Sequence, residues 1–492
     1  MIDFLKALIY NPLHPLLFIS VLFFILFSLF FLIYVVSFKN IKARNILLLL
    51  FSLFFYYKVS GIAVILLLVI STSDFFIGKG IYFSSKPIIK KILLVISILI
   101  NLGNLFYYKY INFLFKAFSD ISGNQDTIVL NIIAPIGISY FIFKSLSYIF
   151  DLYRQNILEP EKNYINYLLY VSFFPNILAG PISKASDLLP QFKNKIIITE
   201  ETISKGFFLI MCGAFKKIFI ADFLAGNFVD RVFDAPQYFT GFESLMASYG
   251  YTIQLYFDFS GYTDIVIGIA CLLGFSILPN FNKPFSAVNV TDFWRRWHLT
   301  LSAWLRDYLF TPLSLKWRNL GVFGLVLAVL ITFIICGFWH DAKYTFIIWG
   351  ALHGIAMAYD IVTNKIRNRI KKKTNKRIYN FISIFITFNF ITFSFIIFRA
   401  SDINIAFKIY EKIFTSLDFG LAAQWINLYI YPFIILILGL LLHYTPFKWN
   451  EFLLNQFTNI HWSLKAFVIF IAFIIIYQIY SSQAQAFLYL EF

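Results

Sequence analysis

Residues 320–339 read LGVFGLVLAVLITFIICGFW, twenty consecutive residues without a charged side chain. A helix needs about 20 apolar residues to cross the hydrocarbon core of a bilayer. The rest of the chain has a similar character: of its 492 residues, 60% are hydrophobic and 13% are charged, whereas soluble domains average about 45–50% and about 25%. The sequence therefore predicts a polytopic membrane protein. Its long apolar runs favour helices over the short alternating strands of a membrane barrel.

Apolar runs of comparable length recur along the chain and predict about eleven membrane-spanning helices. They cover residues 15–37, 45–57 joined to 60–78, 91–115, 129–150, 205–229, 243–275, 320–339, 344–362, 377–398, 429–443 and 464–482. Two further apolar segments, 163–192 and 279–317, are broken by proline, glycine or charged residues. Broken backbone at membrane depth persists only where it is buried in protein or lines a cavity, so we expect re-entrant or interfacial helices in both.

The charge distribution fits a membrane protein better than a nucleic-acid-binding protein. Lys and Arg number 41 against 25 Asp and Glu, which gives a net charge of +16. Eight of the basic residues fall in 365–377, KIRNRIKKKTNKR, which contains no acidic residue and lies between apolar runs. Cytoplasmic loops are enriched in Lys and Arg, so we interpret this run as such a loop. A nucleic-acid partner is disfavoured because no recognition motif accompanies the charge.

One stretch of the second broken segment, TDFWRRWHLTLSAW (291–304), is unusually rich in cations and tryptophan. If residues 291–310 formed one helix, Arg295, His298 and Arg306 would lie on the same face, opposite an aromatic face. Two interpretations are open. The helix either lies at the headgroup level, with arginines reaching the lipid phosphates, or lines an aqueous cavity that holds an anionic ligand.

Ionisable side chains within the apolar spans are the next candidates for function, because such groups are costly in a membrane. Three of the six histidines lie close in sequence: His298, His340 and His353. The alternative for each is a buried neutral imidazole bonded to a backbone carbonyl. Asp258 and Asp264 punctuate another apolar span. Paired carboxylates relay protons in some membrane proteins, but we favour the simpler interpretation that they tie helices together.

A metal site is not expected. The spacings of 42 and 13 residues between the three histidines match no familiar ligand pattern. The three cysteines, Cys212, Cys271 and Cys336, lie in apolar surroundings and form no CxxC pair. We therefore expect small buried side chains there, with neither disulfides nor zinc.

Several motifs together resemble the membrane-bound O-acyltransferase family. They are APIGISYFIFKSLSYIFDLYR (134–154), FFPNILAGPISKASDLLPQF (173–192), YTIQLYFDFSGYTDIVIGIACLLGF (251–275), NKPFSAVNVTDFWRRWHLTLSAWLRDYLFTPL (282–313), GFWHDAKYTFIIWGALHG (337–354) and the terminal FLYLEF (487–492). The resemblance runs from about residue 80 to the end and is greatest for the bacterial alginate and peptidoglycan O-acetyltransferases. It implies a multi-pass protein of the bacterial inner membrane, with helices surrounding a central tunnel.

The resemblance also implies a domain organisation. Residues 1–492 would form one integral membrane domain, with generic spans in 1–80, a family core carrying the catalytic motifs in 130–398 and further spans in 399–492.

The same resemblance implies site residues. The catalytic histidine of the GFWH motif corresponds to His340, with Trp339 before it, and the RWH histidine corresponds to His298. His353, in LHG, matches a further recurrent position. The family usually has Gly after the catalytic histidine, and this chain has Asp341. A carboxylate there would raise the pKa of the imidazole or hold its tautomer.

These residues suggest a mechanism. His340 acts either as the general base for an acceptor hydroxyl or as a transient acyl carrier, and His298 orients the donor or bonds its carbonyl oxygen. Arg295, Arg296 and Arg306 would hold donor phosphates at the cytoplasmic entrance. Asp258 and Asp264 are possible supporting residues.

The resulting functional expectation is transfer of an acetyl group from cytoplasmic acetyl-CoA, without a permanently bound cofactor, to an extracytoplasmic polysaccharide such as peptidoglycan or alginate. Members of this branch usually work with an outer SGNH-type acetyltransferase, so membrane lipid and such a partner are expected. One alternative is a D-alanyl transfer protein that loads teichoic acid from a carrier-protein thioester. Another is a transporter without chemistry, which the concentration of His, Arg and Trp in one block disfavours.

Overall fold

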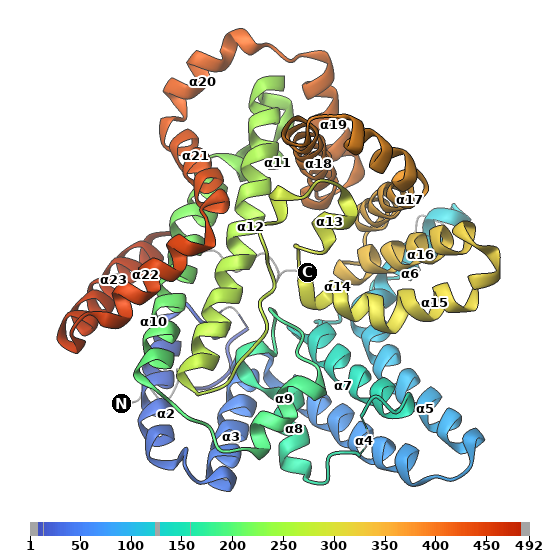
Figure 1. Ribbon diagram of the computed structural model, residues 1–492, viewed down its shortest axis with the longest axis vertical. Coiled ribbons are helices and arrows are strands. Elements are labelled where there is room, and N and C mark those ends of the chain that lie inside the picture. Colours follow the sequence, from blue (N-terminus) through green and yellow to red (C-terminus); the bar gives the residue numbers. More distant parts are fainter. Residues whose placement is uncertain (1–7, 13, 124–127, 158, 484–492) are drawn as a thin grey trace. The chain divides into compact units, whose positions relative to one another are not determined.

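The computed structural model describes residues 8–12, 14–123, 128–157 and 159–483 (Figure 1). These ranges are helices joined by turns, and no strand occurs in them, as expected for an all-α protein. The chain divides into two compact units: unit 1 comprises residues 1–207 and 266–278, and unit 2 comprises 208–265 and 279–492. The FLYLEF motif at 487–492 lies outside the described residues.

The α-helices in chain order have the following bounds: α2 Val21–Ser37, α3 Ile41–Ser60, α4 Val64–Phe83, α5 Pro87–Leu105, α6 Ile111–Ser122, α7 Ile138–Tyr153, α8 Tyr164–Ser172, α9 Ala185–Lys193, α10 Glu200–Phe215, α11 Asp230–Asp234, α12 Gly241–Leu272, α13 Val290–Trp294, α14 Leu299–Leu305, α15 Thr311–Lys316, α16 Val322–His340, α17 Tyr344–Lys373, α18 Lys376–Arg399, α19 Ile403–Thr415, α20 Ala422–Leu428, α21 Ile430–Tyr444, α22 Phe447–Asn459 and α23 Trp462–Gln483.

Six of the described helical segments are long and apolar enough to cross a membrane. They are Ile41–Phe83, Pro87–Ser122, Gly241–Leu272, Arg318–His340, Tyr344–Lys373 and Lys376–Arg399. Two helix pairs bent by 101° and 118°, Phe419–Leu428 with Ile430–Tyr444 and Phe447–Asn459 with Trp462–Gln478, raise the number to eight if each pair is one span. By length and composition, the described chain thus offers six to eight spans, below the predicted eleven. The central tunnel stays a prediction.

Two of the predicted spans are shortened or interrupted for local reasons. The run at 15–37 gives a helix of only 17 residues, because the chain becomes helical after Ser20, whose hydroxyl caps α2. The run at 205–229 begins in α10 and then widens into a π-helical turn, η4 (Lys216–Asp222). Such π-turns mark places where a helix accommodates special side-chain contacts, and the lysines of η4 make such contacts, as described below.

Unit 1 contains the first broken segment, 163–192. Its two short helices, α8 and α9, flank the 3-10 turn η3 (Phe174–Asn176) (Figure 1). Every residue from 166 to 183 is buried. The segment is therefore broken and buried in protein, as its proline and glycine residues indicate, while its re-entrant or interfacial placement stays a prediction.

A buried carboxylate ties three helices of unit 1 together. Asp74 of α4 is fully buried and accepts hydrogen bonds from Ser97 Oγ and Ser145 Oγ at 2.6 Å each and from Asn101 Nδ2 at 2.7 Å. Ser97 and Asn101 belong to α5 and Ser145 to α7. Because each helix supplies part of one hydrogen-bonded group, this network fixes their mutual register.

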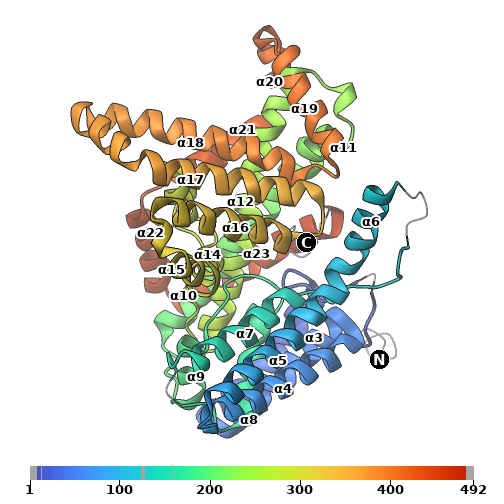
Figure 2. The same ribbon diagram turned by 90° about the vertical axis from the view of Figure 1, so that its right-hand side faces the viewer.

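Unit 2 is organised around the pair α16 and α17, which run side by side and are joined by a three-residue connection (Figure 2). Gly337 and Gly350 lie where the two helices meet. A Cβ atom on Gly337 would collide with the carbonyl oxygen of Phe346, and one on Gly350 with that of Phe333. Small residues permit such close backbone contact between membrane helices, so these glycines set how α16 lies on α17.

The basic run 365–377 is helical, which corrects its interpretation as a loop. α17 continues to Lys373 and α18 begins at Lys376, so only Thr374 and Asn375 connect them. Lys and Arg are good helix formers, and cations in the last turn of α17 complement its dipole.

We expect Gly337→Ala to destabilise the protein by about 1–3 kcal/mol, the usual cost of overpacking a tight contact. The methyl group would force α16 and α17 apart at the Phe346 carbonyl. Gly103→Ala in α5 is the matched control, because a Cβ there meets no atom within 4 Å. Thermal unfolding of the purified protein in detergent measures both variants. Equal melting temperatures for the two would contradict the close contact.

Candidate active site

The stretch 291–304 is broken in the middle. α13 ends at Trp294 and α14 begins at Leu299, and between them His298 adopts the left-handed conformation with φ 44° and ψ 56°. The predicted continuous helix over 291–310 is therefore wrong. A non-glycine residue in this conformation is uncommon and is retained only where the surrounding structure enforces it.

The loop that precedes α13 enforces the break. The N–H of Asn282 donates to the carbonyl of Arg296, and the N–H of Leu299 donates to the carbonyl of Asn280, both at 2.9 Å. These two bonds replace helical hydrogen bonds that a straight helix would have made. The sequence pattern misses them because they come from outside the stretch.

The break places the three side chains of the predicted polar face in two different environments. His298 is fully buried, with its ring edge-on to Phe259 at 4.8 Å between centroids. Arg295 is exposed, and the side chain of Arg306 is 63% exposed. The three side chains therefore do not form one surface. Burial lowers the pKa of His298 to about 3, so its imidazole is neutral near pH 7.

His340 is the last residue of α16 and is 2% exposed. Aromatic rings surround its imidazole: the centroids of Trp339, Trp349 and Phe398 lie at 4.9, 5.3 and 5.4 Å. Trp339, the other residue singled out in GFWH, is thus in direct contact with the imidazole. The imidazole lies inside the protein and not on its lipid-facing surface.

His298 and His340 belong to one aromatic cluster. The chain of ring contacts runs from His298 through Phe259, Phe281, Trp297, Phe395 and Phe398 to His340, with successive centroids 4.8 to 6.0 Å apart. The structure thus brings the two predicted catalytic histidines into the same apolar interior, with α12, α16 and α18 supplying rings around them.

His353 is a tie between elements. The indole N–H of Trp294 donates to its Nδ1 at 3.2 Å, so Nε2 carries the proton and donates to Ser394 Oγ at 3.1 Å. Ser394 in turn donates to the carbonyl of Ile391 at 2.8 Å. This buried ring is bonded on both nitrogens, as in the alternative considered for the histidines, but its partners are side chains and not a backbone carbonyl. It holds α13 against α17 and α18.

The carboxylate of Asp341 is engaged by its C-terminal neighbours. It pairs with Lys343 at 2.8 Å and accepts the N–H of Ala342 at 2.8 Å. The negative charge of Asp341 is therefore balanced by Lys343 and does not act on the imidazole of His340 alone.

Asp258 and Asp264 join α12 to η4. Lys217 Nζ lies 2.6 Å from Asp258 and 2.7 Å from Asp222, and Lys216 Nζ lies 2.6 Å from Asp264. The favoured interpretation, that these carboxylates tie helices together, is confirmed by this geometry. The lysines were overlooked, although a Lys-Lys pair inside an apolar run was a visible signal for buried partners.

The three arginines differ in their partners. Arg296 pairs with Asp292 at 3.0 Å and Arg306 with Asp307 at 2.8 Å. Arg295 makes no ion pair with any described residue and lines a pocket of about 520 Å³. It is therefore the arginine of the three whose charge is available to an anion.

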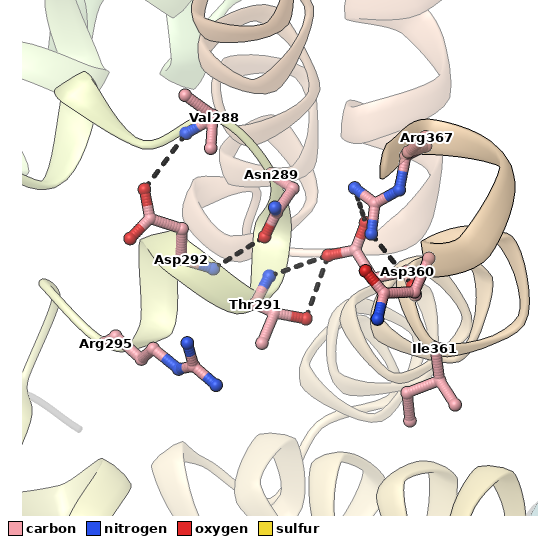
Figure 3. A pocket seen from close by; sticks show the side chains of 9 residues that line it. Val288, Asn289, Thr291, Asp292, Arg295, Asp360, Ile361 and Arg367 are labelled. Carbon is pink, nitrogen blue, oxygen red and sulfur yellow. Dashed lines mark hydrogen bonds and ion pairs between the residues drawn. The ribbon is translucent and has the colours of Figure 1, made fainter. Parts of the chain in front are cut away.

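We call this the Arg295 pocket. It lies between the start of α13 and the C-terminal half of α17 (Figure 3). Its lining residues are Val288, Asn289, Thr291, Asp292, Arg295, Asp360, Ile361, Asn364 and Arg367. Asp360 accepts the Thr291 N–H and hydroxyl at 2.8 and 2.9 Å and pairs with Arg367 at 2.8 Å. These α17 residues were missed, because their role depends on the contact with α13.

No set of three or more His, Cys, Asp or Glu side chains is placed to hold a metal ion in the part of the chain that the structure describes. The cysteines are free thiols, with Cys336 buried and Cys212 and Cys271 half-buried.

Comparison with known proteins identifies the family of this chain. The model of MBOAT, the membrane-bound O-acyltransferase family, matches residues 12–401. The chain belongs to this family. The protein is accordingly a multi-pass membrane acyltransferase, as predicted from its motifs. The match begins well before residue 80, so the first spans, which look generic in sequence, are part of this membrane-bound O-acyltransferase.

Similar proteins fall in the branch indicated by the motifs. A probable alginate O-acetylase of Pseudomonas putida is 35% identical over 389 residues, covering 77% of each chain. A peptidoglycan O-acetyltransferase of Helicobacter pylori is 35% identical over 409 residues, covering 75% of this chain and 74% of that one. A teichoic acid D-alanyltransferase of Bacillus subtilis is 31% identical over 289 residues, covering 56% of this chain and 71% of its own.

We expect His353→Ala to lower stability by about 1–3 kcal/mol, because it leaves the buried indole N–H of Trp294 without an acceptor. Ser394→Ala removes only one of the two bonds and should have a smaller effect. Thermal unfolding in detergent measures both. A His353→Ala protein with an unchanged melting temperature but no transferase activity would instead give His353 a chemical role.

Proposed function

We propose that this O-acyltransferase takes an acetyl group from acetyl-CoA in the cytoplasm and passes it across the bacterial inner membrane for O-acetylation of an extracytoplasmic polysaccharide, such as peptidoglycan or alginate. The observation that carries the proposal is the placement of two sites along α17: the Arg295 pocket at its basic end and His340 near its other end. Two of the similar proteins are named for O-acetylation, which supports acetyl as the group moved.

The charge distribution supports a cytoplasmic position for the pocket. The basic residues of 365–377 follow directly on the pocket residues Asn364 and Arg367. Lys316 and Arg318 precede α16, so cations flank the start of α16 and the end of α17. Such clusters favour the cytoplasmic side. Because α16 begins there and has 19 residues, it carries His340 about 28 Å toward the far side.

The distance between the sites suits a thioester on a long arm. Trp349, which contacts His340, and Asp360, in the pocket, are separated by about 17 Å along α17 at 1.5 Å per residue. Roughly fourteen bonds separate the phosphorus and the thioester carbonyl of a phosphopantetheine thioester, and an extended chain of that length spans about 16 Å. An arm anchored by its phosphate at Arg295 would therefore bring its carbonyl to the level of His340.

The chemistry follows from these positions. The acceptor hydroxyl attacks the thioester carbonyl, and its proton passes to His340 as general base. The C–S bond then breaks, and the CoA thiolate takes the proton back from the imidazolium and leaves as the thiol. The version in which His340 itself carries the acetyl group differs by one added step. His298 orients the donor or bonds the carbonyl oxygen. The aromatic cluster excludes water, which would otherwise hydrolyse the thioester.

The last steps of the transfer take place on the extracytoplasmic side of the membrane. The acetyl group alone crosses, because acetyl-CoA is too highly charged to enter the bilayer and a polymer cannot reach the cytoplasm. An SGNH-type acetyltransferase on the outer side is the proposed partner that completes the transfer to the polysaccharide.

A D-alanyl transfer function is the second candidate, since a teichoic acid D-alanyltransferase is also similar to this chain. Both donors carry a phosphopantetheine arm, so the spacing along α17 suits either. Purified protein in proteoliposomes, offered labelled acetyl-CoA or a D-alanyl carrier protein, distinguishes them by which label is transferred.

We expect His340→Ala to reduce acetyl transfer by a factor of about 10²–10⁴, the usual contribution of a general base. The assay is transfer of labelled acetyl from acetyl-CoA to an outer acceptor in membranes. His461→Ala is the matched control, because this imidazole is exposed and its contacts among the described residues are with its sequence neighbours Trp462 and Ser463. Undiminished transfer by a folded, membrane-inserted His340→Ala protein would rule out the proposed role of His340, whereas transport of intact acetyl-CoA without acetyl transfer by the wild type would rule out the proposed function and favour the transporter.

We expect Arg295→Ala to raise the KM for acetyl-CoA about tenfold to a hundredfold with little change in kcat, because a hydrogen-bonded charge pair contributes about 1.5–3 kcal/mol. Arg306→Ala is the control, since its guanidinium is exposed and already paired with Asp307. Acetyl-pantetheine, which lacks the phosphates, should react equally with both variants and the wild type. An unchanged KM for acetyl-CoA in Arg295→Ala would return this arginine to the headgroup interpretation.

A further inference from the structure

Asn280 lies beside His298 at the helix break and is itself fully buried. Its side-chain oxygen accepts the hydroxyl of Thr300 at 2.7 Å and the backbone N–H of Thr300 at 3.3 Å. Its backbone carbonyl accepts the N–H of Leu299. One residue outside the RWH motif thus holds the two residues that follow His298 by three hydrogen bonds, two from backbone N–H groups and one from the Thr300 hydroxyl.

These bonds determine which way the Asn280 amide faces. A backbone N–H can only donate, so the atom that it meets must be the carbonyl oxygen of the amide and not its NH₂ group. The same oxygen lies 3.4 Å from His298 Nδ1. Since an amide oxygen can only accept, Nδ1 must carry the proton, and Nε2 of the neutral ring is left as an acceptor.

We propose that Asn280 is a positioning residue for the acyl transfer: it fixes His298 as the neutral tautomer protonated on Nδ1, so that Nε2 meets the reacting groups as a hydrogen-bond acceptor. This inference rests on the proposed function of His298. An Nε2 acceptor accepts a hydrogen bond from a hydroxyl or thiol, and it cannot donate one to the thioester carbonyl. Of the two roles suggested for His298, the geometry therefore favours orienting a protonated group.

The proposed role also explains why an amide, and not a carboxylate, occupies position 280. The NH₂ group of Asn280 is buried without an acceptor among the described residues, which is unfavourable. A carboxylate would supply the oxygen without that cost. A carboxylate, however, would favour the charged imidazolium. The neutral amide is the choice that accepts from Nδ1 and leaves His298 uncharged, in keeping with burial as the sole cause of its lowered pKa.

The direct test is ¹⁵N NMR of the full-length protein in lipid, labelled at histidine, with the His298 signals assigned by their loss in His298→Gln. We expect Nδ1 protonated and Nε2 bare in the wild type near pH 7. In Asn280→Asp we expect His298 to become charged at a pH about one to three units higher than in the wild type. A wild-type His298 protonated on Nε2 would overturn the inference without any variant.

Activity gives a second readout. Asn280→Leu should lower kcat for acetyl transfer by about tenfold or more, because part of the His298 population takes the unproductive tautomer, while the KM for acetyl-CoA stays constant. Thr300→Val is the matched control: it removes a bond to the same oxygen but leaves His298 Nδ1 its acceptor, so kcat should change little. Equal loss of kcat in both variants would reduce Asn280 to a packing role.

These outcomes are separate from those for the proposed function. If His340→Ala is inactive while His298 shows the other tautomer, the transferase proposal holds and the inference about Asn280 fails. If the wild-type protein transfers no acetyl group from acetyl-CoA, the proposed function fails, and the NMR result still reports the tautomer of His298.

Discussion

The close contact of α16 and α17 at Gly337 and Gly350 is the constraint on which the candidate site depends. Neither helix tolerates a Cβ atom there, since each glycine faces a backbone carbonyl of the other helix. His340 follows Gly337 by three residues, so this contact determines where its imidazole lies and sets it against Trp349. In a membrane, where lipid is as apolar as leucine, backbone packing of this kind takes over the role of hydrophobic burial in joining helices.

α17 contacts the successive parts of the candidate site along its length. Trp349, His353, Asp360 and Arg367 follow one another at intervals of four, seven and seven residues, which places them on one face of the helix. They contact His340, anchor Trp294, bind Thr291 and line the Arg295 pocket in turn. A single helix thus fixes the separation between the Arg295 pocket and the His340 imidazole, and in the proposed function this separation sets the length of donor that fits.

Sequence reasoning reached the fold class, the family and both histidines of the aromatic cluster, because apolar length and local motifs are written contiguously. It failed where a residue's environment comes from a distant segment. Asn280 pairs with the backbone after His298, and Asp360 with that of α13, so neither has a local signal. The count of spans exceeded the structure for a related reason: hydropathy reports apolar length, whereas bends and π-turns depend on partners such as Asp258 for Lys217.

The helix break at His298 separates the environment of its imidazole from that of the Arg295 guanidinium. A continuous helix would have placed His298 and Arg295 on one face, at one depth and in one dielectric environment. The left-handed turn sends the imidazole into the aromatic cluster, where it is neutral, and leaves the guanidinium at the pocket, where it stays hydrated. In the proposed function, Arg295 binds an anion, which needs a charged group near water, and His298 accepts a hydrogen bond, which needs an uncharged ring. The four residues from Arg295 to His298 therefore reach two contrasting environments. The loop through Asn280 stabilises the left-handed turn that separates them.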